Sequence, residues 1–113
     1  MSADDACIGL VALYRWRLRS GAEDAFVQAW REVTEALLRH GSFGSRLHRG
    51  DDGLWYGYAQ WPDAATRAAA TAAGAVDPAL FARMSACIEA SFPEIALAPV
   101  ADLLRLPHNP TPG

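Results

Sequence analysis

The chain has 113 residues, of which 51% are hydrophobic and 20% are charged, so its length and composition suit one compact domain. The net charge of -3 and the absence of a long basic run argue against nucleic-acid binding. No apolar run approaches the roughly 20 residues that span a bilayer, and the acidic N-terminal residues do not suit a signal peptide. We therefore expect a cytoplasmic protein with no membrane partner, one domain over residues 1–106 and a mobile proline-rich tail over 107–113.

The N-terminal third of the chain predicts a strand followed by a helix. Along residues 7–18, the even-numbered positions form an apolar face, while the odd-numbered positions form a face that becomes basic near its end. Glu23 and Asp24 then place carboxylates in the first turn of a helix, where they complement the helix dipole. Apolar residues recur every three or four positions over 26–37, and Gly41 supplies a residue suited to ending the helix.

The middle of the chain predicts a hairpin and a short helix. Residues 43–49 and 54–61 are two strands around a Gly-Asp-Asp-Gly turn, whose residues tolerate positive φ. Pro62 ends the second strand. The alanine-rich stretch 64–73 has the helix propensity to form a second helix by itself.

The C-terminal third predicts a third helix and a last strand. Asp77 is a suitable N-cap, and Pro78 follows it at the first helical position. An apolar stripe from Leu80 to Phe92 predicts a helix that Pro93 ends. Residues 100–106 are then the fourth strand.

This order of elements predicts an α+β fold, the ferredoxin-like split βαβ, in which helices cover one face of a four-stranded antiparallel sheet. The first strand nevertheless carries apolar side chains on both faces, as Val11 and Leu13 lie opposite Leu10 and Trp16. The uncovered face needs a partner. We therefore expect a homodimer that packs sheet against sheet through the open face and so forms a dimeric α/β barrel.

Three stretches of the chain, 14–26, 41–47 and 60–63, resemble the antibiotic biosynthesis monooxygenase-like domains, a family of dimeric α/β barrels. The resemblance extends from Ile8 to Leu106. It implies an oxidoreductase, and specifically a cofactor-independent monooxygenase that acts on a small aromatic or polyketide-like phenol with molecular oxygen as co-substrate.

The family's branches differ in their site residues, and this chain matches none of them fully. The heme-degrading branch has an asparagine where this chain has Tyr14 and a tryptophan where it has Ala70, and no histidine occurs from 64 to 91. Heme is therefore not expected, and we expect neither a cofactor nor a metal. In the quinone-forming branch, the strand-end tryptophan is retained as Trp61, but the asparagine four residues earlier is Gly57.

Arg67 stands where the quinone-forming branch has an aromatic residue on the next helix. We identify Arg67 as a candidate catalytic residue that steadies a phenolate or carboxylate, although it also keeps an alanine helix soluble. His48 is a candidate general base because its ordinary pKa is near neutral, or else a solvent-facing or interfacial residue. The candidate substrate-binding residues are aromatic, which suits a flat ligand, although such rings also serve as core. They are Tyr14, Trp16, Trp30, Tyr58 and Trp61.

Two other functions remain open on the sequence. The first is a non-catalytic dimer that binds a small molecule or acts as an accessory barrel, which the loss of polar residues at Gly57 and Ala70 favours. The second is an isomerase or cyclase, which needs an acid and a base facing one cavity and could draw only on His48 and Arg67.

Overall fold

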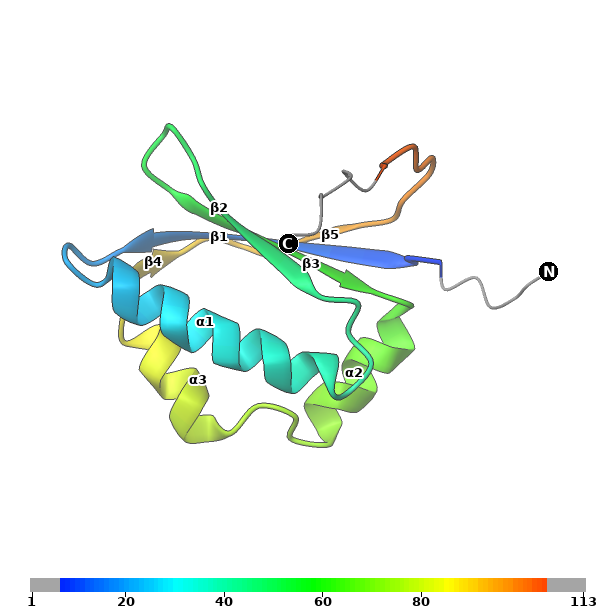
Figure 1. Ribbon diagram of the computed structural model, residues 1–113, viewed down its shortest axis with the longest axis horizontal. Helices are drawn as coiled ribbons and strands as arrows, with labels where there is room; N and C mark the ends of the chain where they lie inside the picture. The colour runs from blue at the N-terminus through cyan, green and yellow to red at the C-terminus, as the bar shows by residue number, and fades with distance from the viewer. Residues whose placement is uncertain (1–6, 106–113) are drawn as a thin grey trace, which may run out of the picture.

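The structure, a computed structural model, describes residues 7–105, and the tail predicted at 107–113 lies outside this range. The helices and strands follow in the order shown in Figure 1. They are β1 (Leu10–Leu18), α1 (Glu23–Leu38), β2 (Ser45–Arg49), β3 (Trp55–Trp61), α2 (Ala64–Ala72), α3 (Pro78–Ser85), β4 (Ile88–Ser91) and β5 (Ile95–Leu97).

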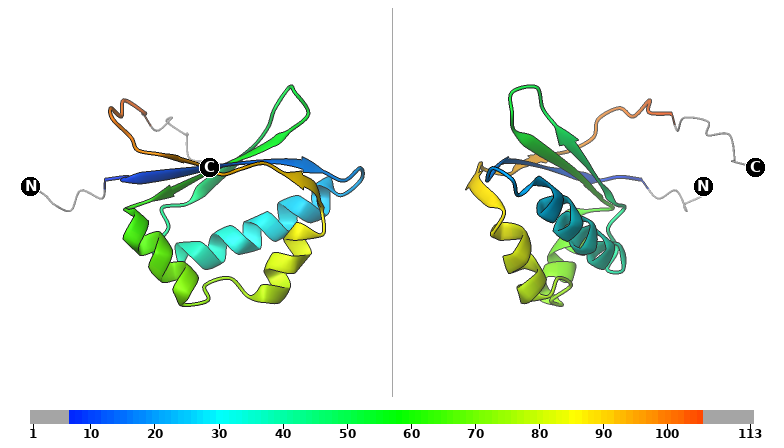
Figure 2. Two further views of the ribbon diagram at one scale, coloured as in Figure 1. Left: turned by 180° about the vertical axis from the view of Figure 1, so that it is seen from behind. Right: turned by 60° about the vertical axis from the view of Figure 1, so that its left-hand side comes forward.

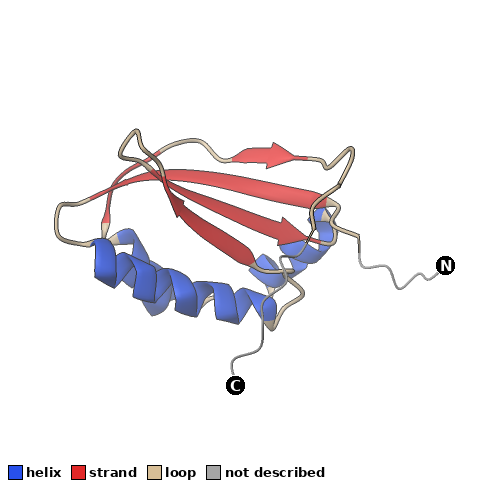
Figure 3. Cartoon of the chain, turned by 45° about the horizontal axis from the view of Figure 1, so that its top comes forward, coloured by secondary structure: helices blue, strands red, loops and turns tan. Residues whose placement is uncertain are grey.

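The strands form one antiparallel sheet in the order β2-β3-β1-β4, and β5 also pairs with β1. Strand β1 is central because β3 pairs along one of its edges and β4 and β5 pair in succession along the other. All three helices lie on one face of the sheet, as the views in Figures 2 and 3 show. This arrangement confirms the predicted α+β, ferredoxin-like fold.

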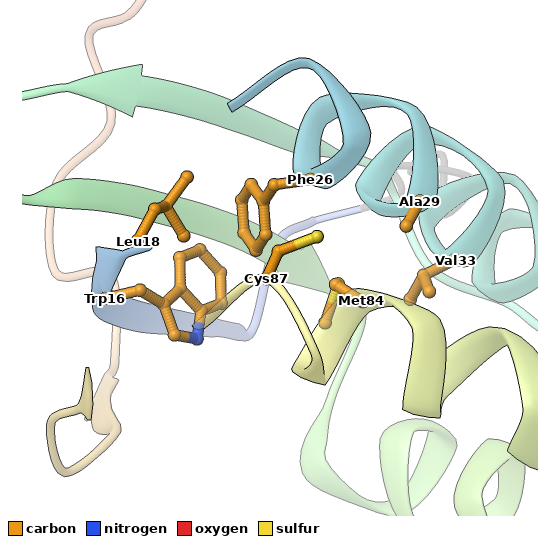
Figure 4. Close-up of a cluster of buried hydrophobic side chains, with 7 residues drawn as sticks. All are labelled: Trp16, Leu18, Phe26, Ala29, Val33, Met84 and Cys87. Atoms are coloured by element: carbon orange, nitrogen blue, oxygen red, sulfur yellow. The ribbon is translucent and has the colours of Figure 1, made fainter. Parts of the chain in front are cut away.

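The hydrophobic core fills the space between the sheet and the helices (Figure 4). The even-numbered side chains of β1 point into it, as the alternation of the strand predicts. Trp16 is 8% exposed, stacks on Tyr14 with ring centres 5.6 Å apart, and meets Phe26 edge-on at 5.2 Å. The buried cluster consists of Trp16, Leu18, Phe26, Ala29, Val33, Met84 and Cys87.

Gly57 makes room for this core. It lies opposite Tyr14 in the β1–β3 register, on the face that carries the helices. A Cβ atom at position 57 would lie 2.8 Å from Trp16 Cη2 and 3.0 Å from Trp16 Cζ3, closer than packed carbon atoms approach. The indole ring of Trp16 thus occupies the space that any side chain at position 57 would need.

Two predictions for the C-terminal third are wrong. The third helix does not reach Phe92, since α3 ends at Ser85 and residues 88–91 form β4. In β4 exposure alternates along the chain, which is a strand pattern, and pairing with β1 satisfies backbone groups that this edge would otherwise leave open. Residues 100–105 form no strand, because β4 and β5 already occupy the edge of β1.

The first helix, the hairpin and the second helix lie where the sequence predicts them, within a few residues at their ends. Gly41 has a φ of 100°, which explains why a glycine follows the end of α1. No helix within residues 7–105 has the length and hydropathy that crossing a membrane requires.

Replacing Gly57 with alanine should lower the free energy of unfolding by about 1–3 kcal/mol, because the added methyl group meets a ring that Tyr14 and Phe26 hold in place. Urea denaturation followed by circular dichroism measures the change. As a control, the same substitution in a Trp16→Phe background should cost less, because the smaller ring leaves space. A Gly57→Ala protein as stable as the original would contradict this packing.

Candidate functional site

Three polar side chains meet on the helix side of the sheet and form what we call the Tyr14–Arg67–Glu94 cluster. The guanidinium of Arg67 donates to both carboxylate oxygens of Glu94, from Nη1 at 2.7 Å and from Nη2 at 2.5 Å. Nη2 also donates to the hydroxyl oxygen of Tyr14 at 2.7 Å. This bidentate contact fixes the orientation of the Arg67 guanidinium as well as its position.

The three residues come from three separate parts of the chain. Tyr14 points toward the helices through the alternation of β1. Arg67 lies in the first turns of α2, which begins immediately after β3 because the Asp63 carboxylate caps it by accepting from the Thr66 N–H at 2.7 Å. Glu94 lies in the connection between β4 and β5.

A β-bulge brings Glu94 to this position. Trp16 pairs with Ser91 and Leu13 pairs with Ile95, so three residues, 92–94, stand opposite the two β1 residues between them. One extra residue on one strand is the definition of a bulge, and it bends the strand and redirects a side chain. The fourth strand of the fold is therefore split in two at the residue that contacts Arg67.

The cluster is half-buried and open to solvent on one side. The Arg67 side chain is 27% exposed and that of Glu94 is 33% exposed. Burial raises the pKa of the Tyr14 hydroxyl above its ordinary value of 10.0, although the nearby charge of Arg67 acts in the opposite direction. The hydrogen bonds from Arg67 hold the pKa of Glu94 below its usual value, and those to Glu94 raise the pKa of Arg67. Near neutral pH the cluster therefore holds one positive charge, one negative charge and one neutral phenol.

Aromatic side chains support the cluster from within the core. The Arg67 guanidinium carbon lies 5.9 Å from the centre of the Tyr14 ring, which in turn stacks on Trp16. Trp61 is 2% exposed, and Trp30 packs partly buried against the core. The structure therefore places Tyr14, Trp16, Trp30, Trp61 and Arg67 on one side of the sheet.

The other two candidate residues lie on the opposite face. In the register of the sheet, His48 is level with Tyr56 and Arg15, and Tyr58 is level with Arg46 and Leu13. These positions alternate with Tyr14 and Gly57, which face the helices. The sheet thus separates His48 and Tyr58 from Arg67, and one small ligand cannot contact all three.

Two open cavities, of about 500 and 420 Å³, lie on the face that carries His48 and Tyr58. They border each other, since Tyr58 and Leu104 line both. The segment after β5 forms much of the wall of the larger one, and Figure 1 shows it in orange, on the side away from the helices. His48 and Arg46 line the smaller cavity.

Glu94 is the functional candidate that sequence reasoning missed. Arg67 stands out as the lone charge of an alanine helix, but no feature near it in the sequence points to Glu94, which follows it by 27 residues. The bulge between β4 and β5 is what brings Glu94, and not another carboxylate, into contact with Arg67. Within residues 7–105, no group of three or more His, Cys, Asp or Glu side chains is arranged to hold a metal ion.

Comparison with solved structures identifies proteins that share this fold. No family model matches the sequence, and no curated protein matches it either. Among solved structures, the chain is similar to a monooxygenase from the gene ActVA-Orf6 of Streptomyces coelicolor, solved with the ligand Nanaomycin D, at 18% identity and a TM-score of 0.70. That match covers 94% of this chain and all of the other.

Two further structures have the same fold at similar identity. SnoaB, a cofactor-independent oxygenase from Streptomyces nogalater, matches at 17% identity and a TM-score of 0.68, over 88% of this chain and 100% of that one. An uncharacterised NIPSNAP domain protein from Burkholderia xenovorans matches at 19% identity and a TM-score of 0.63, over 85% and 99%. The chain therefore has the α+β, ferredoxin-like fold of the antibiotic biosynthesis monooxygenase-type proteins, as its sequence motifs predict.

Proposed function

We propose that this protein is a cofactor-independent monooxygenase that oxidises a small aromatic or polyketide-like phenol with molecular oxygen, and that the Tyr14–Arg67–Glu94 cluster is its site. One observation carries the proposal: a neutral phenol and a fixed guanidinium meet at a half-exposed position beside stacked aromatic rings. The fold adds support, because it is shared with SnoaB, a cofactor-independent oxygenase.

The proposed reaction needs stabilisation of negative charge more than any other aid. Loss of a proton from an anthrone-like phenol gives an electron-rich anion that reduces oxygen directly. One oxygen atom becomes a new carbonyl of the quinone, and the other leaves as water with the two hydrogens of the oxidised methylene group. The donors of Arg67 and Tyr14 would stabilise the phenolate and the peroxide that follows it, and partial burial strengthens such interactions.

His48 cannot serve as the base for a ligand at this cluster, because it lies across the sheet. The proton of an acidic phenol would instead leave to water on the exposed side of the cluster. Arg67 therefore keeps its proposed catalytic role. His48 and Tyr58 lie on the opposite face of the sheet and take no part in this site.

One feature favours the alternative, a small-molecule-binding or accessory barrel without catalysis. The Trp16 ring fills the space beneath Gly57, where the quinone-forming branch has an asparagine side chain. A polar group that this branch carries therefore has no counterpart here. The two functions differ in one measurable property, which is oxygen consumption.

Oxygen uptake by the purified protein, with a chelator present, should occur with an anthrone-like phenol and consume one oxygen molecule for each quinone formed. Replacing Arg67 with methionine should lower kcat by about a hundredfold, the scale seen when one donor to a developing anion is lost. Arg83→Met is the matched control, since Arg83 also pairs with a glutamate, at 2.7 Å, but joins α1 to α3. No uptake by the folded wild-type protein with any phenol would reject catalysis and favour the binding function.

The open face of the sheet supports the proposed homodimer. Large apolar side chains in and after β5 are exposed, with Val100 at 97%, Leu103 at 96% and Leu104 at 78%. Val11 and Tyr58 of the sheet line the cavity beside them. A second copy of the chain, packed sheet to sheet, would cover both the apolar segment and the cavities.

Replacing Leu103 and Leu104 together with aspartate should convert the protein from dimer to monomer, because the charges would be buried in the interface. Sedimentation equilibrium measures the change in mass. Phe81→Asp is the matched control, since Phe81 is also apolar and 54% exposed but lies on α3, on the helix side. A monomeric wild-type protein, or a double variant that stays dimeric, would contradict this interface.

A further inference from the structure

We propose that Glu94 makes the Tyr14–Arg67–Glu94 cluster selective for uncharged aromatic ligands, such as phenols and quinones that bear carbonyl groups, over carboxylated ones. The inference rests on the proposed function, since it describes the ligand of the same site. It assigns Glu94 a positioning and specificity role that neither the sequence nor the fold indicates.

Most of the hydrogen-bond donors of Arg67 are already in use. A guanidinium has five N–H groups, and those of Arg67 already make two hydrogen bonds to Glu94 and one to Tyr14. Glu94 occupies the Nη1/Nη2 edge of the guanidinium, and Tyr14 takes a further N–H of Nη2, so no edge with two free donors remains for a ligand carboxylate. An anionic ligand would have to displace a carboxylate that is part of the protein and is already in the favoured geometry.

The charges of the cluster also weaken its attraction for a ligand carboxylate. Arg67 and Glu94 carry opposite charges and Tyr14 is neutral, so a carboxylate meets less net positive charge than an unpaired arginine would present. A phenolate formed at the site can still accept from the N–H groups that Glu94 and Tyr14 leave free. A ligand carboxylate approaching from the exposed side would also lie near the carboxylate of Glu94, and juxtaposed like charges oppose binding. An uncharged ligand meets no such repulsion.

The Tyr14 hydroxyl is the group of the cluster that can donate to an uncharged ligand. Its oxygen accepts from Arg67, and its own O–H interacts with the Glu94 carboxylate, an acceptor that a ligand oxygen would replace. Burial and the nearby Glu94 both favour the protonated hydroxyl. A ligand carbonyl is an acceptor of the right kind for this O–H group, and the stacked Tyr14 and Trp16 rings beside it suit a flat aromatic molecule.

The bulge between β4 and β5 is the structural device that supplies this carboxylate. An uninterrupted fourth strand would pair residue for residue with β1, whereas the extra residue at 92–94 breaks that pairing opposite Tyr14. Bulges recur beside functional sites because they redirect one side chain without disrupting the rest of a sheet. Glu94 is the residue that gains this freedom, and it reaches Arg67.

The test is a binding measurement that does not depend on turnover. Anaerobic absorbance titrations would compare a dihydroxyanthraquinone with its carboxylic-acid derivative, which differ by one negative charge. The wild-type protein should bind the uncharged quinone more tightly, by about tenfold. Glu94→Gln should reduce or reverse this ratio by about tenfold, because the charge of Arg67 is then no longer offset.

Two variants complete the design. Glu94→Asp retains the negative charge and should retain the selectivity, which separates a charge effect from a disturbed fold. Glu32→Gln is the matched control, since Glu32 is a similarly exposed carboxylate paired with Arg83, and its loss should leave the ratio unchanged.

The outcomes separate this inference from the proposed function. A wild-type protein that prefers the carboxylate, binds neither quinone, or keeps its selectivity in Glu94→Gln would overturn the inference. Selective binding without oxygen uptake would support the inference while rejecting catalysis. Oxygen uptake without selective binding would support catalysis while rejecting the role proposed for Glu94.

Discussion

The guanidinium of Arg67 joins three parts of the chain: β1, α2 and the connection between β4 and β5. Helix α2 buries a single side chain, Ala70, so apolar packing alone holds it weakly against the sheet. Arg67 ties it to β1 through Tyr14 and to the bulge between β4 and β5 through Glu94. An exposed ion pair contributes little to stability, but a half-buried pair with two parallel hydrogen bonds sets a definite geometry. This contact helps to hold α2 against the sheet, and the chemistry of the candidate site depends on it.

The two faces of the sheet carry different sets of residues. The helix side contains the polar cluster and the aromatic core, whereas the open side contains two cavities, His48, Tyr58 and an exposed apolar segment. Because the sheet keeps these sets apart, separate mutations can test the proposed catalysis and the proposed homodimer. Trp16 fills the space at Gly57, so no polar side chain can lie there. The proposed site therefore depends on the Tyr14–Arg67–Glu94 cluster.

Local patterns in the sequence predict most of the fold. Alternation in β1, the apolar stripe of α1, the glycine-rich hairpin and the alanine-rich α2 each depend on nearby residues, and each lies where it was predicted. The boundary after α3 was missed because a stripe of apolar residues continues past Ser85, and four residues are too few to show a change of period. Long-range pairing with β1 decides that boundary, and no local pattern contains it.

The candidate site likewise combines residues that stand out in the sequence with contacts that only long-range pairing determines. Tyr14 and Arg67 stand out by residue type, but the bond between them does not, and Glu94 follows from a bulge that only the register reveals. Residue type alone groups His48 and Tyr58 with them, because the side of a sheet that a strand residue faces depends on register, and a shift of one position exchanges the faces.

The most direct test of the Tyr14–Arg67–Glu94 cluster as the site is to find which face of the sheet an aromatic ligand contacts. In anaerobic NMR titrations with a dihydroxyanthraquinone, we expect the side-chain signals of Arg67 and Tyr14 to shift, while those of His48 and Arg83 stay unchanged. Shifts confined to His48, Tyr58 and Arg46 would place the ligand in the open-face cavities and contradict the assignment of the Tyr14–Arg67–Glu94 cluster as the site.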